Sequence, residues 1–131
     1  MKSDAFRVAI VTGGGRGLGR AMVLGLLQND FAVAAVDRDA APLEEISALA
    51  REDGHAAALL TIAADLTLPG AAEQIGTQVL ARFARLDILV NNAGMGLSVL
   101  WPDRWTRPVR FWEVEPEQWR LFFKTNTDTQ F

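Results

Sequence analysis

The sequence predicts an α/β fold in which a doubly wound parallel sheet carries helices on both faces. Short, nearly continuous apolar runs are typical of parallel strands that are buried on both sides. These runs alternate with longer segments in which apolar residues recur at helical spacing, which favours right-handed strand–helix–strand crossovers. A glycine cluster also follows the first apolar run directly, at residues 12–19. We therefore expect one domain over residues 1–131, with its strands in the order 3-2-1-4.

The first strand is predicted over residues 6–12 and the first helix over residues 17–29. The strand is almost continuously apolar from Val8 to Val11. The helix is expected to lie close to the sheet, because its apolar stripe includes small residues. Its predicted inner face consists of Leu18, Ala21, Met22, Gly25 and Leu26.

The second and third strands are predicted over residues 31–36 and 57–64, each closed by an aspartate. Between them a helix begins near Pro42, a residue that suits the first turn, and Gly54 is expected to end it. The predicted inner face of this helix consists of Leu43, Ile46, Leu49 and Ala50.

A third helix opens at Pro69-Gly70, and a fourth strand over residues 86–90 runs directly into residues 91–94. The predicted inner face of this helix consists of Ala72, Ile75, Val79, Leu80 and Phe83. In doubly wound sheets, ligands bind beyond the carboxyl ends of the strands. We therefore expect the binding site where the glycine cluster and the polar residues after the other strands meet.

Composition narrows the class of protein. A net charge of −3 gives no reason to expect a nucleic acid or an anionic membrane as partner. Without cysteine and with His55 as the single histidine, the chain offers no thiolate site, and we expect no metal and no Ser-His-Asp triad. No apolar run approaches the ~18 residues of a membrane span, and the start of the chain lacks a signal-peptide pattern. We expect a cytoplasmic protein.

The glycine cluster is interpreted as a phosphate-binding turn. Glycines allow positive φ values and a close approach of the backbone, and the helix that follows points unpaired N–H groups at a bound anion. A Walker A loop is excluded because no lysine lies between Lys2 and Lys124. The spacing is Thr-Gly-x-x-x-Gly-x-Gly, and the residues of the turn are Thr12, Gly13, Gly15, Gly17 and Gly19.

Asp37 is the candidate ligand of an adenosine ribose. It ends the second strand, near the offset of ~20 residues at which an acid accepts hydrogen bonds from the ribose hydroxyls. A carboxylate also repels a 2′-phosphate, which favours NAD over NADP. Arg16 and Arg38 favour NADP instead, because either arginine can pair with a 2′-phosphate. The alternative role for Asp37 is a turn or helix cap.

Other polar residues at this edge have two interpretations each. Asp65 can accept a hydrogen bond from the adenine amino group, with the Leu66 backbone beside it, or it caps the turn before Pro69. Asn91 and Asn92 line the cofactor or tie adjacent strands together through their amides, and for Asn91 we favour the structural role.

In this combination of motifs the chain resembles the short-chain dehydrogenases/reductases. The resemblance extends from about residue 7 to residue 131 and is carried by Thr12-Gly13-x-x-x-Gly17-x-Gly19, Asp65-Leu66 and Asn91-Asn92-Ala93-Gly94. It implies a Rossmann fold, a nicotinamide cofactor, and hydride transfer to or from an alcohol or carbonyl.

The resemblance also implies a role for each matching residue. Those that would hold the pyrophosphate are Gly13, Arg16, Gly17, Leu18 and Gly19. Asp37 would hold the ribose, Asp65 and Leu66 the adenine, while Asn92, Ala93 and Gly94 would pass beside the cofactor. Gly15 and Arg38 complete the predicted cofactor site. Asn126 matches the asparagine that supports a water-linked proton relay to the catalytic lysine; without the resemblance it is a surface or helix-kink residue.

The chain departs from the family pattern in its catalytic residues. The family's chemistry uses a Tyr-x-x-x-Lys pair, in which the tyrosine transfers the hydroxyl proton, and a serine on the preceding strand. This chain has no tyrosine, and Ser98 lies too early to be that serine. We therefore expect a cofactor-binding half that ends before the catalytic segment and is inactive alone. Its fourth strand would be an exposed apolar edge.

The segment after Gly94 differs in composition and is expected to be mostly loop until Pro116 begins a helix. It holds all four tryptophans and several prolines. Beside the cofactor, its tryptophans and arginines would shape a pocket for an apolar or acidic substrate. Alternatively, the loop packs its tryptophans on the domain surface or against a partner subunit.

Our functional prediction is an NAD-dependent oxidoreductase acting on a small alcohol or carbonyl, as a homo-oligomer in the complete protein. One alternative is a non-catalytic nucleotide-binding module or truncated product. A methyltransferase with an adenosyl cofactor shares the strand–glycine–acid pattern, but the motif at residues 91–94 argues against it.

Overall fold

A computed structural model of the chain describes residues 6–130. The chain forms two compact units, one up to Ala93 and one from Gly94 onward. The first unit contains the sheet and its three main helices, and the second contains two further helices. The expectation of one domain over residues 1–131 stays a prediction.

Four parallel strands form the sheet of the first unit in the order β3-β2-β1-β4, which confirms the predicted order. Their bounds are β1 Val8–Thr12, β2 Ala32–Asp37, β3 Leu59–Ala63 and β4 Ile88–Val90. The register sets Thr12 opposite Val36 and Val11 opposite Val90. The turns that follow β1, β2 and β4 therefore start side by side at one edge of the sheet.

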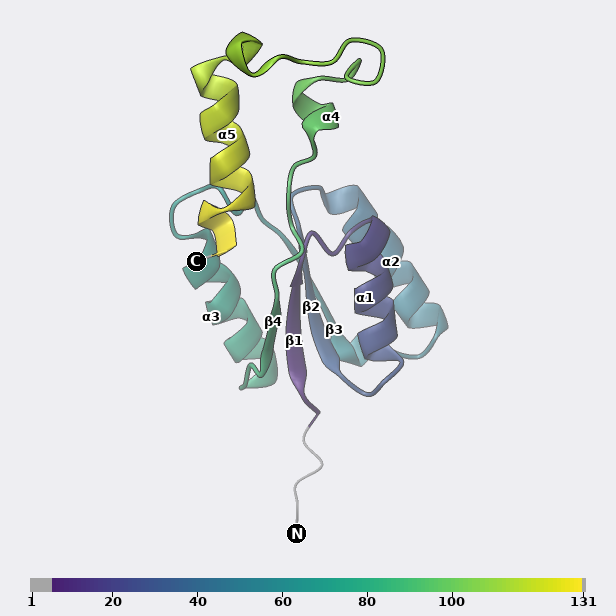
Figure 1. Cartoon of the computed structure of the whole chain (residues 1–131). Helices are drawn as coiled ribbons and strands as arrows, with labels where there is room; N and C mark the ends of the chain where they lie inside the picture. Colours follow the sequence, from purple (N-terminus) through teal and green to yellow (C-terminus); the bar gives the residue numbers. More distant parts are fainter. Residues whose placement is uncertain (1–5, 131) are drawn as a thin grey trace. The chain divides into compact units, whose positions relative to one another are not determined.

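Helices cover both faces of this sheet (Figure 1). The helix α1 (Gly17–Leu27) and the helix α2 (Ala40–Glu52) lie on one face, and α3 (Ala71–Phe83) lies on the other. A 3₁₀ turn at Ala56–Ala58 precedes β3, so the strand begins two residues later than the predicted residue 57.

Each face of the sheet has its own apolar core, because successive strand residues point to opposite sides. On the α1 and α2 side, the core comprises Ala9, Val11, Val23, Leu27, Phe31, Val33, Ala35, Leu43, Ile46 and Ala50. On the α3 side, it comprises Val8, Ile10, Ala32, Ala34, Val36, Ile62, Ile75 and Val79. Both β1 and β2 are buried on each face, as expected for central parallel strands.

The predicted inner face of α1 is wrong in part: Met22 and Leu26 pack against the core, but they are not the most buried residues. The buried residues are Gly19, Val23 and Leu27, whereas Leu18 is 71% exposed and Ala21 is also exposed. Two apolar stripes, one residue apart, run along this helix. The stripe that contains Val23 is the one most deeply buried against the sheet. In α3, the predicted Ile75 and Val79 are buried, but Ala72 and Leu80 point to solvent.

The second unit contains the short helix α4 (Leu97–Leu100), which sequence reasoning did not predict, and α5 (Pro116–Asn126), which begins at the expected proline. Two 3₁₀ turns lie at Phe111–Glu113 and Asp128–Gln130. Trp105 and Phe111 are each 84% exposed. Across residues 6–130, none of the helices combines the length and the apolar character needed to cross a membrane.

Candidate functional site

The turn after β1 is held in place by the next strand. Gly13 and Gly17 have φ angles of +62° and +51°, in the left-handed region that favours glycine. Between them, the N–H of Gly14 donates to the carbonyl of Val36 at 2.9 Å. This bond attaches the glycine turn to the end of β2.

Close packing explains most of the glycines in the turn. A Cβ at Gly13 would lie 2.9 Å from the Cα of Ala93, and one at Gly15 would lie 2.7 Å from a carboxylate oxygen of Asp37. At Gly19, a Cβ would overlap the carbonyl oxygen of Gly13. At Gly17, by contrast, a Cβ would meet nothing within 4 Å. Three of these glycines, Gly13, Gly15 and Gly19, thus allow close internal contacts. Gly17 instead leaves open space at the start of α1.

The hydroxyl of Thr12 connects the end of β1 to the segment after β4. It accepts hydrogen bonds from the backbone N–H groups of Asn92 and Ala93, both at 3.0 Å, and donates to the Val90 carbonyl at 3.3 Å. Thr12 is only 6% exposed. Its hydroxyl therefore fixes where the chain leaves β4.

The side-chain amide of Asn92 strengthens the same connection. Its Nδ2 donates to the carbonyl of Thr12 at 3.0 Å and to that of Gly13 at 3.1 Å. The role of tying strands together, considered for both asparagines, is therefore filled by Asn92. For Asn91, the structural role stays a prediction.

The N-terminus of α1 is open to a ligand. Its N-cap residue, Arg16, makes no side-chain cap to the first-turn amides, and its side chain is 68% exposed. Leu18, in the first turn, is also exposed. Unpaired N–H groups and the positive end of the helix dipole make such a terminus attractive to a phosphate.

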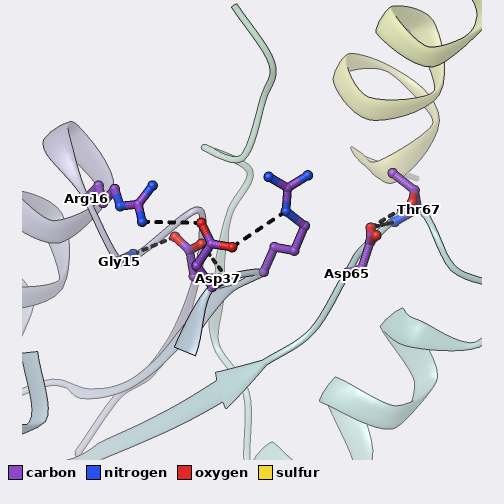
Figure 2. Close-up of polar contacts among 7 residues, drawn as sticks. Gly15, Arg16, Asp37, Asp65 and Thr67 are labelled. Carbon is purple, nitrogen blue, oxygen red and sulfur yellow. Dashed lines mark hydrogen bonds and ion pairs between the residues drawn. The ribbon is translucent and has the colours of Figure 1, made fainter. Parts of the chain in front are cut away.

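The carboxylate of Asp37 lies beside this terminus, as Figure 2 shows with Gly15 and Arg16. One oxygen accepts the N–H of Gly15 at 2.9 Å, and the other accepts the N–H of Asp39 at 3.2 Å. The predicted turn-capping role is thus present in the structure. Each carboxylate oxygen can accept about two hydrogen bonds, so the group keeps capacity for a further donor.

Two arginines surround the carboxylate of Asp39. Arg16 Nη2 lies 3.3 Å from its Oδ2, and Arg38 Nε lies 3.8 Å from its Oδ1. Arg38 itself is exposed. Both arginines near the end of β2 are therefore paired with one acid, beside the carboxylate of Asp37.

Asp65, after β3, organises its own turn. Its Oδ1 accepts the N–H of Thr67 at 2.9 Å and the hydroxyl of Thr67 at 2.7 Å (Figure 2). The capping interpretation of Asp65 therefore has direct support, while contact with an adenine stays a prediction. Leu66 is half-buried and packs against the core on the α3 side.

In the second unit, the side-chain amide of Asn126 makes two hydrogen bonds with the backbone of Met95, the residue after Gly94. Its Oδ1 accepts the N–H of Met95 at 2.6 Å, and its Nδ2 donates to the carbonyl of Met95 at 3.0 Å. A Cβ at Gly94 would lie 2.8 Å from the same Oδ1. The Asn126 amide thus has a local structural role, which the interpretation as a surface residue did not include.

A pair of groups with shifted pKa values lies at the opposite edge of the sheet. A hydrogen bond from Arg85 holds the pKa of Asp87 below its ordinary value, with help from the N–H of Val8. The same hydrogen bond raises the pKa of Arg85. This pair joins the start of β1 to the start of β4 and belongs to the fold rather than to the candidate site.

Two residues with important contacts were not assigned by sequence reasoning. Thr12 was read as part of the motif, but its hydroxyl contacts were not expected. Asp39 was given no role, yet it pairs with both arginines. A hydroxyl-bearing residue at the last position of a strand, directly before a glycine turn, is a signal that could have identified Thr12.

Taken together, the described residues fit a dinucleotide. An uncapped helix terminus with open space at Gly17 suits a pyrophosphate, and the Asp37 carboxylate on the neighbouring strand suits a sugar hydroxyl. Within residues 6–130, no group of three or more acidic, histidine or cysteine side chains is arranged to hold a metal ion.

Comparison with known families and proteins agrees with this geometry. Residues 7–131 match the model of the family described as short chain dehydrogenase. The cis-2,3-dihydrobiphenyl-2,3-diol dehydrogenase of Pseudomonas sp. (strain KKS102) is 38% identical over 88 residues, covering 67% of this chain and 30% of that protein. The fluoren-9-ol dehydrogenase of Terrabacter sp. (strain DBF63) is 31% identical over 122 residues, covering 93% of this chain and 33% of that protein.

A solved structure gives the same result. The 3-ketoacyl-(acyl-carrier-protein) reductase from Brucella melitensis, complexed with NADH, has a TM-score of 0.78 and 30% identity. The match covers 94% of this chain and 45% of that one. The chain thus spans about a third of the two curated relatives and just under half of the solved structure. Because the family match extends over nearly all its residues, the chain belongs to the short-chain dehydrogenase family.

Proposed function

We propose that this chain is the NAD-binding part of an oxidoreductase that transfers hydride between the nicotinamide and a small alcohol or carbonyl. The observation that carries the proposal is the meeting of three elements at one edge of the sheet. These are the uncapped N-terminus of α1, the Asp37 carboxylate, and the segment after β4 that Thr12 and Asn92 hold against the glycine turn.

Each element would make one part of the cofactor contact. First-turn amides of α1, with Arg16 beside them, would bind the pyrophosphate, for which the dipole and the cation are both favourable. Asp37 would accept hydrogen bonds from the ribose, and Asp65 with Leu66 would contact the adenine. When bound, the nicotinamide supplies or accepts the hydride. The NADH in the Brucella reductase supports this class of cofactor.

Residues 92–94 would pass beside the cofactor, and Asn126 would support a proton relay, as the family resemblance implies. The tyrosine that transfers the hydroxyl proton in this family cannot come from these 131 residues, because they contain none. We propose that the complete protein supplies it in further sequence and acts in the cytoplasm as a homo-oligomer.

The second candidate function is a nucleotide-binding module without catalysis, because the uncapped terminus of α1 and the Asp37 carboxylate would hold a nucleotide whether or not a reaction follows. The intact mass of the protein from its natural source separates the two. A mass well above 14.3 kDa would support the oxidoreductase, and a mass of 14.3 kDa would support the module.

The direct test is calorimetric titration of the chain with NADH, NADPH and an adenosyl methyl donor. Asp37→Ala is expected to weaken NADH binding by roughly tenfold to a hundredfold, because charge-assisted hydrogen bonds contribute about 1.5–3 kcal/mol. Asp53→Ala, an equal loss of charge at the exposed end of α2, is the matched control and should bind NADH normally.

Thermal unfolding of both variants separates a loss of binding from a loss of folding, since Asp37 also caps its own turn. Binding of the methyl donor without NADH would overturn the oxidoreductase proposal. Equal NADH affinity in the Asp37→Ala variant and the unsubstituted chain would overturn the ribose assignment.

A further inference from the structure

A hollow of about 560 Å³ lies at the amino ends of the strands, at the edge of the sheet opposite the glycine turn. In Figure 1 this is the edge at which the strand arrows begin. The lining includes Val8 and Ala32, the first residues of β1 and β2. Because all the lining residues belong to the first unit, that unit forms the hollow by itself.

Most of the lining is apolar. Two aromatic rings contribute to it, that of Phe6, which is 62% exposed, and that of the half-buried Phe83. Small-molecule sites are typically hollows of roughly 300–1,000 Å³ with apolar walls and a few polar groups. The hollow therefore has the size and the walls of a site for a small molecule with an apolar body.

Arg82 is a cation of this lining that keeps hydrogen-bond donors available. Its Nη2 donates to the carbonyl of Ala57 at 2.6 Å, and its guanidinium lies 5.1 Å from the centre of the Phe83 ring. Within residues 6–130, the ion pairs do not include Arg82. Since a guanidinium carries five N–H donors, several remain for a ligand.

The other charges of the lining limit the charge of such a ligand. Arg85 donates from Nε and Nη2 to Asp87, at 2.9 Å and 2.6 Å, so its charge is already matched. Asp30 adds a negative charge to the lining. One unmatched cation in the presence of an acid suits a single negative charge better than the two of a phosphate.

The backbone beside these residues has an uncommon conformation. Ala84 ends α3 at a φ of +59°, a position that commonly belongs to glycine, and Asp30 has a φ of +60°. Non-glycine residues held in this region cost free energy and gather at ligand-binding sites. The turn at Ala84 brings its two neighbours, Phe83 and Arg85, into the lining together.

We propose that this hollow is a second ligand site, which binds a monocarboxylate with an apolar body. Arg82 pairs with the carboxylate, for which a guanidinium has the matching geometry. The rings of Phe6 and Phe83 cover the apolar body. The site lies at the edge of the sheet opposite the glycine turn, so its ligand does not compete with a dinucleotide, and the proposal does not depend on the proposed function.

Titration of the full chain with cinnamate, followed by NMR of the backbone amides, tests the proposal. We expect the amide signals of residues 54–58 and 82–85 to shift, while those of residues 13–19 stay in place. Cinnamyl alcohol, which keeps the ring and lacks the charge, should bind about tenfold more weakly. Inorganic phosphate should leave the same signals unshifted.

Arg82→Gln is expected to weaken cinnamate binding about tenfold, because it removes the charge and keeps a donor for the Ala57 carbonyl. Arg51→Gln is the matched control. It removes an equal charge near the end of α2, does not line the hollow, and should bind cinnamate normally. Ala57→Leu adds bulk to the lining without changing the charge and should also weaken binding. Thermal unfolding shows whether each variant is folded.

Two outcomes would overturn the proposal: amide signals of residues 54–58 and 82–85 that do not move at millimolar cinnamate, or equal binding of cinnamate and cinnamyl alcohol. Shifts produced by phosphate would overturn the preference for a single charge. Unchanged cinnamate affinity in folded Arg82→Gln would overturn the role of Arg82. A separate titration with NADH keeps the two proposals distinct, since failure to bind NADH would overturn the proposed function alone.

Discussion

Alanine at Gly19 and at Gly25 should change the stability of the chain in opposite directions, although both residues lie in α1. In a helix interior, replacing glycine by alanine is favourable by about 0.5–1 kcal/mol, because glycine loses more backbone entropy on folding. A Cβ at Gly25 would meet nothing within 4 Å. Gly25→Ala is therefore expected to stabilise the chain by that amount.

At Gly19 the same methyl group has no space. It would overlap the carbonyl oxygen of Gly13 and lie 2.6 Å from Nδ2 of Asn92. Overpacking of this kind costs about 1–3 kcal/mol. Displacing the Asn92 amide would also weaken two hydrogen bonds, at about 1 kcal/mol each. After the helix-propensity gain, Gly19→Ala should destabilise the chain by about 2–4 kcal/mol.

Urea unfolding followed by far-UV circular dichroism measures both variants against the unsubstituted chain. Because the substitution and the helix are the same, the two variants differ chiefly in the environment of the Cβ. A free energy of unfolding for Gly19→Ala within about 0.5 kcal/mol of the unsubstituted chain would refute the packing argument. A loss of stability in Gly25→Ala similar to that in Gly19→Ala would refute it as well.

Two further substitutions test contacts that hold the sheet together. Thr12→Val removes the hydroxyl, which leaves the N–H of Ala93 without its acceptor and that of Asn92 with only the Val90 carbonyl at 3.1 Å, so a loss of about 2 kcal/mol is expected in urea unfolding. Thr12→Ser keeps the hydroxyl and should recover most of this loss; equal effects of the two variants would contradict the assignment. The pKa of Asp87 is lowered in the folded chain, chiefly by the hydrogen bond from Arg85, so this group stabilises the fold above the ordinary carboxyl pKa. That contribution is lost as the pH falls through the lowered pKa of the folded state, and Asp87→Asn should flatten the dependence of unfolding free energy on pH between neutral and acid conditions. If the unfolding free energy of Asp87→Asn falls as steeply with decreasing pH as that of the unsubstituted chain, other carboxylates cause the loss of stability in acid.

The order of the strands and the edge that carries the site could be predicted from the sequence. Apolar runs that alternate with helical segments leave few topologies, because right-handed crossovers fix where each new strand is added. The glycine turn and Asp37 then fall at the same edge of the sheet, since parallel strands all end on one side. This reasoning needs only local patterns and a general rule of handedness.

The faces of the helices were harder to predict. In α1, Leu18 and Met22 on one stripe and Val23 and Leu27 on the next are equally apolar, so hydrophobic periodicity alone did not select between them. The sheet buries Val23 and Leu27 and leaves Leu18 exposed at the start of the helix. Such a choice depends on the shape of the partner surface, which a single segment does not encode.

By itself the sequence determined the α/β class, the strand order, the position of the glycine turn and the acid at the end of β2. Only the tertiary structure decided which atoms hold these parts together: the Thr12 hydroxyl on the segment after β4, and Asp39 between two arginines. The reason is that backbone hydrogen-bond patterns and burial follow from local periodicity, whereas a side-chain contact joins residues far apart in the chain. For Thr12 and Ala93, and for Arg16 and Asp39, the partner is fixed only when the strands have come together in register.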